Sequence, residues 1–284
     1  MIDKLSASEL VLNADGSVYH LNLLPEDIAD KIILVGDPDR VPKVSQFFDK
    51  VEIKKNKREF YTHTGVLRGE RISVLSTGIG TENIDIVMNE LDALVNIDLN
   101  NKEFHSEKKS LQLFRLGTCG SVNPDIEVDN MLVSENVVGL DGLLHFYSDY
   151  HFENDFSKKF LSDFPYDNIK PMLYFGECSS ELKNLYKDAK YFGNTATFPG
   201  FYAPQGRQLR LRALDGKFLE VLNELGISNF EMETSAIYGL AKLLGHRAIT
   251  VNCVIANRRL GEFSADHHKV ERDAIQWVLD RIIQ

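Results

Sequence analysis

The stretch Ile72-Ser-Val-Leu-Ser-Thr-Gly-Ile-Gly80 begins with apolar and β-branched residues and ends in a glycine turn. Apolar side chains then recur at steps of three and four residues, at Ile84, Val87, Met88, Leu91, Leu94 and Val95. A short apolar run predicts a buried strand, and the three-and-four spacing predicts an amphipathic helix. A strand, a glycine turn and a helix in this order make one α/β unit.

The same alternation of strand and helix patterns extends along the chain in both directions. We expect a hairpin within 58–77, strands at 31–36, 111–116, 170–175, 191–196 and 247–256, and helices at 180–189, 215–225, 233–244 and 265–282. Gly226 and Gly245 follow two of these helices, as glycines commonly do at helix C-termini. The pattern predicts an α/β fold, a single three-layer domain with a mixed central sheet flanked by helices.

Neither a repeat nor a linker divides the sequence, so we expect one domain over residues 1–284. Within it, residues 1–19 form an N-terminal extension, and the polar, aperiodic segment 98–110 is a surface insertion. Of 284 residues, 32 are Lys or Arg and 42 are Asp or Glu, giving a net charge of -10. This acidic total disfavours binding along nucleic acid or an anionic membrane, but one cavity can still be locally positive.

The three cysteines, Cys119, Cys178 and Cys253, are widely spaced and odd in number. That pattern argues against a disulfide framework and against a zinc site, and it favours buried structural thiols. The paired His267 and His268 likewise lack partners at metal-ligand spacing, and we expect them to be exposed. With neither a signal-peptide pattern nor a membrane-length apolar run, we expect a cytoplasmic protein.

Three glycine-containing stretches follow or lie in predicted strands. They are Gly36-Asp-Pro-Asp-Arg40, Thr77-Gly-Ile-Gly80 and Arg115-Leu-Gly-Thr-Cys-Gly120, and we interpret residues 117–121 as a loop. Such loops at strand ends bind anions through backbone N–H groups, but these lack the dinucleotide and P-loop patterns. Arg40 could instead begin a helix and pair with Asp37 or Asp39, whereas Arg115 sits in an apolar strand and needs a buried partner or a ligand.

Two further clusters contain side chains that suit a small polar ligand. Phe201, Gln205 and Arg207 could meet the polar edge and the face of a heterocycle, although this segment taken alone favours a solvent-exposed loop. Glu231 and Glu233 stand where a short strand meets a helix, and acids there also stabilise a helix N-terminus.

Eight segments in this order resemble the nucleoside phosphorylase family, in its uridine phosphorylase type, from about residue 20 to 283. They are His20-Leu-Asn-Leu23, Gly36-Asp-Pro-Asp-Arg-Val41, Arg58-Glu-Phe60, Ser76-Thr-Gly-Ile-Gly80, Arg115-Leu-Gly-Thr-Cys-Gly120, Phe201-Tyr-Ala-Pro-Gln-Gly-Arg207, Glu231-Met-Glu-Thr-Ser-Ala236 and Val254-Ile-Ala-Asn-Arg258. The resemblance implies a pentosyltransferase that performs phosphorolysis, in which inorganic phosphate and a pyrimidine nucleoside, above all uridine, give the free base and a pentose 1-phosphate.

The resemblance also implies a role for each matching residue. The phosphate-binding residues would be Gly36, Arg40, Arg115 and Thr118, joined by Arg58 from a neighbouring subunit. The ribose-binding residues would be Glu231, Met232 and Glu233, joined by His20 from the neighbour. The base-binding residues would be Phe201, Gln205 and Arg207. Among these, Arg115 would orient phosphate, Arg207 would stabilise the departing base, and Glu233 would clamp the ribose hydroxyls.

Inorganic phosphate is then a co-substrate, and we expect no organic cofactor and no metal chemistry. Some relatives hold a monovalent cation between subunits, near the positions of Glu59, Ile79 and Asn83. The expected assembly is at least a homodimer, with a homohexamer as the larger alternative. A purine, deoxy or modified-pyrimidine nucleoside remains an alternative substrate. In the purine branch of the family, the last motif carries an aspartate that acts as a general acid near the base, whereas this motif ends in Asn257. A non-catalytic nucleoside-binding protein is the alternative of another class.

Overall fold

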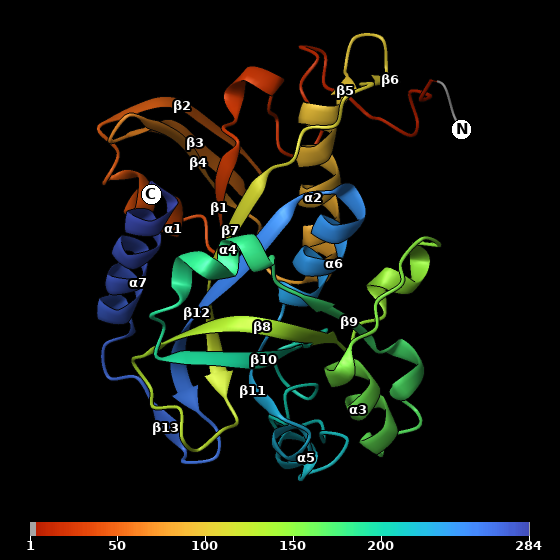
Figure 1. Cartoon of the computed structure of the whole chain (residues 1–284), viewed down its shortest axis with the longest axis vertical. Coiled ribbons are helices and arrows are strands. Elements are labelled where there is room, and N and C mark those ends of the chain that lie inside the picture. Colours follow the sequence, from red (N-terminus) through yellow and green to blue (C-terminus); the bar gives the residue numbers. More distant parts are fainter. Residues whose placement is uncertain (1–3, 284) are drawn as a thin grey trace.

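A computed structural model of the chain describes residues 4–283 (Figure 1). Its strands are β1 (Lys31–Val35), β2 (Lys50–Lys57), β3 (Phe60–Leu67), β4 (Glu70–Ser76), β5 (Ile97–Asp98), β6 (Glu103–Phe104), β7 (Gln112–Ser121), β8 (Met131–Gly139), β9 (Tyr174–Glu177), β10 (Tyr191–Thr197), β11 (Ile227–Glu231), β12 (Arg247–Asn257) and β13 (Glu262–Phe263). Its α-helices are α1 (Arg40–Ser45), α2 (Thr81–Asn96), α3 (Asp155–Asp163), α4 (Ser180–Lys183), α5 (Phe218–Glu224), α6 (Thr234–Leu244) and α7 (His267–Ile282). Short 3-10 turns lie at Pro25–Asp27, Leu143–Phe146, Lys170–Met172 and Asn184–Tyr186.

The large sheet is mixed, and part of it closes into a ring. β12 pairs in parallel with β7 and antiparallel with β8, while β8, β10 and β11 continue in parallel pairs. β11 then pairs antiparallel with β7 and completes a five-stranded ring. β12 occupies one edge of β7, and β1 pairs with residues 112–116 on the opposite edge, ahead of the pairing with β11. From β1 the strands β4, β3 and β2 continue the sheet as an open extension.

Helices cover the central strands from two sides. In Figure 1, α1 and α7 lie on one side of the strands, and α2 and α6 lie on the other. α2 packs against α6, and α7 packs on β12 and β7. The buried faces of α2 and α7 include Ile84, Val87, Leu91, Val278 and Ile282, as their apolar spacing predicts. The expected three-layer α/β fold is therefore confirmed, with the ring as a feature that the sequence pattern does not reveal.

Two local expectations are wrong. Residues 117–121 are not a loop but the second half of β7, because β12 pairs with this strand along its whole length. Gly120 allows a close approach of the Phe230 side chain to this strand, because a Cβ on Gly120 would lie 2.6 Å from the ring of Phe230. Residues 170–172 form a 3-10 turn rather than a strand, since Pro171 lacks the N–H that a strand needs, and β9 starts at Tyr174.

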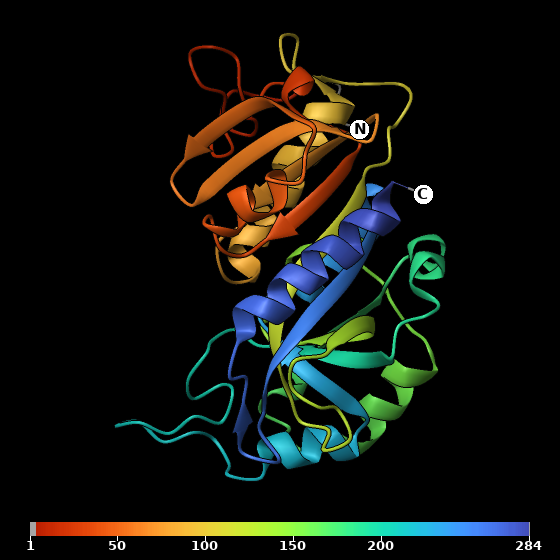
Figure 2. The same cartoon turned by 90° about the vertical axis from the view of Figure 1, so that its left-hand side faces the viewer.

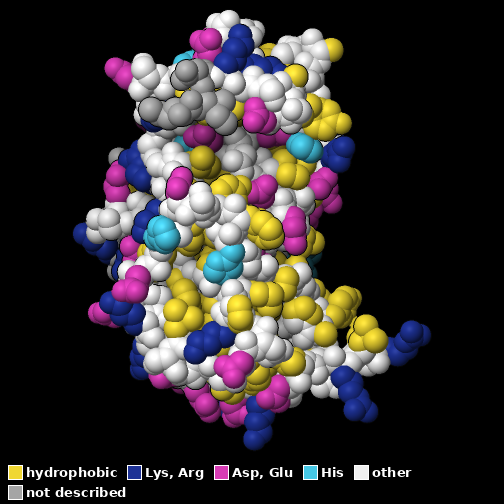
Figure 3. All heavy atoms as spheres, turned by 90° about the vertical axis from the view of Figure 1, so that its right-hand side faces the viewer, with side chains coloured by type: hydrophobic (Ala, Val, Ile, Leu, Met, Phe, Trp, Pro, Cys, Tyr) yellow, Lys and Arg dark blue, Asp and Glu magenta, His cyan; other side chains and the backbone are white. Residues whose placement is uncertain are grey.

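Residues 4–19 and the segment 98–110 lie side by side at one end of the molecule (Figure 1). β5 and β6 pair within this segment, and the backbone N–H of Leu5 donates to the carbonyl oxygen of Lys102 at 2.9 Å. At the opposite end, residues 207–217 project from the body with Leu209 and Leu211 exposed (Figure 2). Figure 3 shows basic side chains at the tip of this projection. Within residues 4–283, none of the helices is long and apolar enough to span a bilayer.

The close approach of Gly120 to Phe230 makes a stability prediction. Gly120→Ala places a methyl group against a ring that is only 2% exposed and cannot move aside, so we expect a loss of about 1–3 kcal/mol in unfolding free energy, measured by urea denaturation. Gly216→Ala is the matched control, because nothing lies within 4 Å of the added Cβ. Equal stability of the two variants would contradict the packing explanation.

Candidate functional site

A cavity of about 740 Å³ lies beside the carboxyl ends of β1, β4 and β11 and against β7 and β12. The edge of an α/β sheet at its carboxyl ends is the usual place for a ligand. Ten of the residues predicted to bind phosphate, ribose or base line this one cavity: Gly36, Arg40, Arg115, Thr118, Phe201, Gln205, Arg207, Glu231, Met232 and Glu233. The structure therefore brings together segments that are up to about 200 positions apart in the sequence.

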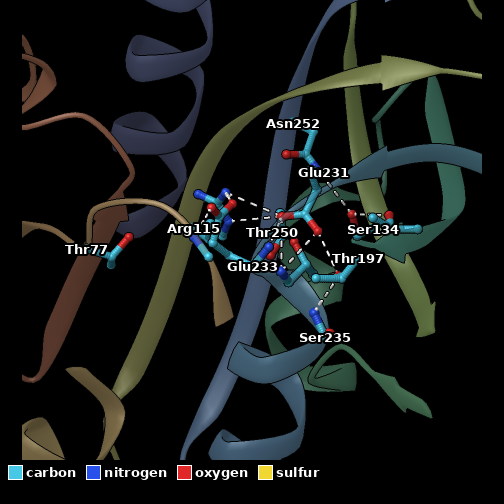
Figure 4. A network of polar contacts seen from close by, with 12 residues as sticks. Thr77, Arg115, Ser134, Thr197, Glu231, Glu233, Ser235, Thr250 and Asn252 are labelled. Atoms are coloured by element: carbon cyan, nitrogen blue, oxygen red, sulfur yellow. Dashed lines mark hydrogen bonds and ion pairs between the residues drawn. The ribbon is translucent and has the colours of Figure 1, made fainter. Parts of the chain in front are cut away.

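Arg115 and two carboxylates form a buried ion group at the back of the cavity (Figure 4). Arg115 lies on β7 and is 4% exposed; its Nη2 contacts Oε2 of Glu233 closely and lies 3.3 Å from Oε2 of Glu231. The sequence required a buried partner or a ligand for this arginine, and the structure supplies partners. Nη1 of Arg115 has no hydrogen-bond partner among the described residues, which leaves both N–H donors of this buried nitrogen unsatisfied.

Glu231 serves mainly as a cap for α6. Its carboxylate accepts from the backbone N–H groups of Glu233 and Thr234, each at 3.0 Å, and from Oγ1 of Thr197 at 2.8 Å. Together with Arg115 these donors occupy the roughly four lone-pair positions of a carboxylate. The alternative that an acid here stabilises a helix N-terminus is therefore correct for Glu231.

Glu233 keeps acceptor capacity toward the cavity. One oxygen accepts from the backbone N–H of Gly80 at 2.8 Å, and the other contacts Arg115. Burial raises the pKa of the Glu233 carboxyl above its ordinary value; the charge of Arg115 opposes this shift and that of Glu231 adds to it. Of the two carboxylates, Glu233 is the one with lone pairs left for a ligand hydroxyl.

Arg40 begins α1, as expected, but it does not pair with Asp37 or Asp39. Its Nε instead donates to Oε1 of Glu271 on α7, and its Nη1 donates to the carbonyl oxygen of Leu116 at 3.1 Å. Asp37 serves the turn itself, because its Oδ1 accepts from the N–H of Asp39 at 2.9 Å. The sequence carries no local signal for Glu271, which lies 231 positions from Arg40.

The aromatic, amide and guanidinium groups of the loop at 201–207 contact one another at the far end of the cavity. The guanidinium carbon of Arg207 lies 3.8 Å from the ring centroid of Phe201, and its Nη1 donates to Oε1 of Gln205 at 2.5 Å. Gln205 is 2% exposed, so this is not a solvent-exposed loop at that position. Arg258, the last residue of the motif at 254–258, donates from Nη1 to the carbonyl oxygen of Gln205 at 3.3 Å.

His20 and Arg58 do not line the cavity of their own chain. Nδ1 of His20 lies 2.6 Å from Oε1 of Glu90, whose carboxylate also accepts from the backbone N–H of His20. Lys57, next to Arg58 in the β2–β3 turn, donates to the carbonyl oxygen of Tyr19. These contacts fix the segment that carries His20 against the turn that carries Arg58, so both belong to one surface.

Glu59, Ile79 and Asn83 meet around Gly78 at the edge of the cavity. A Cβ on Gly78 would lie 2.4 Å from Nδ2 of Asn83 and 2.9 Å from Cγ of Glu59, so the two side chains close on this glycine. Nδ2 of Asn83 donates to the carbonyl oxygen of Ile79 at 3.4 Å. The three groups named as a cation site thus lie close together.

The cysteines and the histidine pair have no place in this site's chemistry. All three cysteines are buried and unpaired, and burial raises the pKa of Cys178 to about 11 and of Cys253 to about 12. Cys119 lines the cavity, but burial raises its thiol pKa as well, so it is no thiolate nucleophile at neutral pH. His267 and His268 are exposed, as expected. Across residues 4–283, none of the His, Cys, Asp and Glu groups forms a cluster of three or more that could hold a metal.

Comparisons with known proteins point to one family. The model described as "Phosphorylase superfamily" matches residues 30–284. A uridine phosphorylase of Thermococcus kodakarensis is 31% identical over 93% of this chain and 86% of its own length. A DeoD-type purine nucleoside phosphorylase of Oceanobacillus iheyensis is 27% identical over 93% of this chain and 99% of its own length. A solved nucleoside phosphorylase of Trypanosoma brucei, whose description reports uridine phosphorylase activity, has 26% identity and a TM-score of 0.84 over 96% of this chain and 99% of its own.

The buried ion group predicts a stability loss that depends on pH. Arg115→Met leaves two buried carboxylates without their cation, which costs about 3–5 kcal/mol of unfolding free energy near neutral pH. The raised pKa of Glu233 means that the folded state favours its protonated form, and the loss of Arg115 raises this pKa further. The stability that protonation of Glu233 gives to the folded protein is present at low pH. It is lost as the pH rises through the pKa that Glu233 has in the folded state. The deficit of the variant should therefore grow between about pH 5 and about pH 7.5.

Denaturant unfolding at both pH values measures this deficit. Arg210→Met is the matched control, because Arg210 is an exposed arginine of the projecting segment and should give no pH-dependent loss. A deficit of equal size at both pH values would contradict the assignment of Arg115 as the counter-ion of Glu233.

Proposed function

The chain belongs to the phosphorylase superfamily, and on that basis we propose that it is a pentosyltransferase acting on a pyrimidine nucleoside. The proposed reaction converts uridine and inorganic phosphate into uracil and ribose 1-phosphate. The observation that carries it is the presence of Gln205 and Arg207 in the same cavity as Arg40 and Arg115. The uridine phosphorylases among its relatives support the same substrate class.

The chemistry of an N-glycosidic bond explains the two ends of the cavity. Cleavage builds positive charge on the sugar and negative charge on the departing base. In the proposal, phosphate held by Gly36, Arg40, Arg115 and Thr118 lies at one face of the ribose and stabilises the positive charge. Glu233 accepts from the ribose hydroxyls beside Met232, which fixes the sugar between phosphate and base.

The base end offers hydrogen-bond donors to the departing uracil. Because Oε1 of Gln205 accepts from Arg207, the amide is oriented with its Nε2 free to donate. Nη1 of Arg207 also donates to the carbonyl oxygen of Phe201 at 2.7 Å, which leaves Nε and Nη2 for the base. Donors of this kind strengthen their hydrogen bonds as the ring gains negative charge, and that difference lowers the barrier.

Asn257 argues against a purine mechanism that uses an acid at this position. It is fully buried, its Nδ2 donates to the carbonyl oxygens of Asn123 and Ile126 at 2.9 Å each, and its Oδ1 accepts from the N–H groups of Arg259 and Leu260. All hydrogen-bonding positions of this side chain are thus used within the chain. An amide so engaged has no proton to give to a leaving purine.

The charge of the cavity supports a shared site. Among the described residues, three arginines line it (Arg40, Arg115 and Arg207), together with four acids (Asp37, Glu59, Glu231 and Glu233). One chain therefore offers phosphate no excess of positive charge. We propose that Arg58 of a second copy completes the phosphate site and His20 of that copy reaches the ribose, in a homodimer or a larger assembly of dimers.

Phosphate is the co-substrate in this proposal, and no organic cofactor takes part. A monovalent cation at Glu59, Ile79 and Asn83 would belong to the same contact between copies, with a structural role. The three unpaired cysteines support a reducing compartment such as the cytoplasm.

The first test is phosphate dependence. Purified protein should release uracil from uridine at a rate that rises with inorganic phosphate and falls to background without it, followed by ultraviolet absorbance. Release at an equal rate in phosphate-free buffer would indicate a hydrolase, and no turnover at all would favour a binding protein. Parallel assays with thymidine, deoxyuridine and inosine rank the substrates, and inosine as the best substrate would overturn the pyrimidine assignment.

The second test is complementation between two inactive variants. Arg58→Asn removes the shared arginine with a residue that tolerates its positive φ of 56°, and Arg207→Ala disables the base end. Each variant alone should lose at least about 100-fold in kcat/KM. A dimer with one subunit of each variant has one intact site, which combines Arg207 of the Arg58→Asn subunit with Arg58 of the Arg207→Ala subunit. In an equal mixture that exchanges subunits, about half of the dimers are mixed, so the mixture should recover about a quarter of wild-type activity. No recovery despite exchange, or a fully active monomer by light scattering, would contradict the shared site.

A further inference from the structure

Glu271 is a buried carboxylate on a helix whose other buried residues are apolar. It is 6% exposed, and its buried neighbours on α7 include Val270, Ala274, Ile275 and Val278. Glutamate is rarely buried without a specific partner, because desolvation of its charge is costly. This position therefore calls for an explanation beyond the packing of α7 on β12.

The partners of Glu271 are three basic groups, of which Arg40 lines the cavity. Oε1 accepts from Nε of Arg40, and Oε2 lies 3.2 Å from Nζ of Lys43 and 3.7 Å from Nδ1 of His268. Burial opposes the ionisation of Glu271, but the charge of Arg40 and the hydrogen bonds from Arg40 and Lys43 hold its pKa below the ordinary value. The carboxylate is therefore ionised at neutral pH.

Two contacts on different sides of the guanidinium fix its plane. Nε–H of Arg40 is taken by Glu271, and one N–H of Nη1 is taken by the carbonyl oxygen of Leu116. An arginine has five N–H donors, so three are left without a partner among residues 4–283, one on Nη1 and two on Nη2. Arg40 lines the cavity, and this remaining fork is the edge that can meet a phosphate bidentately.

We propose that Glu271 is a positioning residue for phosphate binding, which holds the free fork of Arg40 toward the cavity. This inference rests on the proposed function. The arrangement has an electrostatic cost, because a carboxylate beside an anion site weakens the attraction for phosphate. Orientation of Arg40 therefore has to outweigh that repulsion, and two conservative substitutions separate the two effects.

Glu271→Asp keeps the charge but shortens the side chain by one methylene, so the carboxylate no longer reaches Nε of Arg40. Glu271→Gln keeps the length and one acceptor oxygen but removes the charge. If Glu271 acts by position, the KM for phosphate rises about 10-fold in Glu271→Asp and stays within about 2-fold of wild type, or falls, in Glu271→Gln. The KM for the nucleoside stays within about 2-fold in both, because the base end is untouched.

The test measures both KM values, together with phosphate binding by calorimetry without nucleoside and the melting temperature of each variant. Asp273→Asn, an exposed acid on the same helix, is the control for loss of charge and should match wild type. An unchanged phosphate KM in Glu271→Asp, a Glu271→Gln variant as impaired as Glu271→Asp, or both KM values rising in step with a lower melting temperature would each overturn the proposal. If the wild type binds phosphate but turns over no nucleoside, the proposed function fails, and the calorimetric comparison still decides the role of Glu271.

Discussion

The buried ion group of Arg115, Glu231 and Glu233 is the constraint on which the cavity depends. Its members come from β7, from the end of β11 and from the residue before α6, and the backbone N–H of Gly80 ties the turn after β4 to the same group. Buried charges are stable only when each is paired and hydrogen-bonded. These elements therefore have to meet in one arrangement, which is also the arrangement that closes the ring of strands.

Closure of the ring explains where sequence patterns predict this molecule and where they do not. The strand, glycine turn and helix from Ile72 onward are local, and α2 begins and ends close to where apolar spacing indicates. Residues 117–121 have the composition of a turn, but pairing with β12, more than 120 positions away, holds them as a strand. Local composition cannot reveal such a partner, and the same applies to the pairing of β7 with β11.

The candidate site shows the same division between local and distant information. Arg40, Arg115, Gln205, Arg207 and Glu233 are site candidates because eight ordered motifs together resemble one family, whereas each motif alone is a weak signal. Glu271 stands in an ordinary amphipathic helix, and only the docking of α7 shows its contact with Arg40. Arg258 is an intermediate case, since its motif is visible in the sequence but its contact with Gln205 is not. Residues in the ordered motifs can thus be predicted as site candidates more readily than the residues that contact and orient them.

Each of the two arginines of one chain that we propose to bind phosphate is paired with a carboxylate, Arg40 with Glu271 and Arg115 with Glu233. Two unpaired guanidinium groups would repel each other in the empty cavity and would destabilise the fold. Glu271 and the Glu231–Glu233 pair offset that repulsion. Their contacts also fix the direction of the guanidinium N–H groups that the carboxylates do not use. The protein's net charge of -10 gives no long-range attraction for phosphate either, so capture has to rely on short, oriented contacts. In the proposed assembly, the arginine of a second copy then supplies the excess positive charge, and phosphate affinity becomes a property of the dimer rather than of one chain.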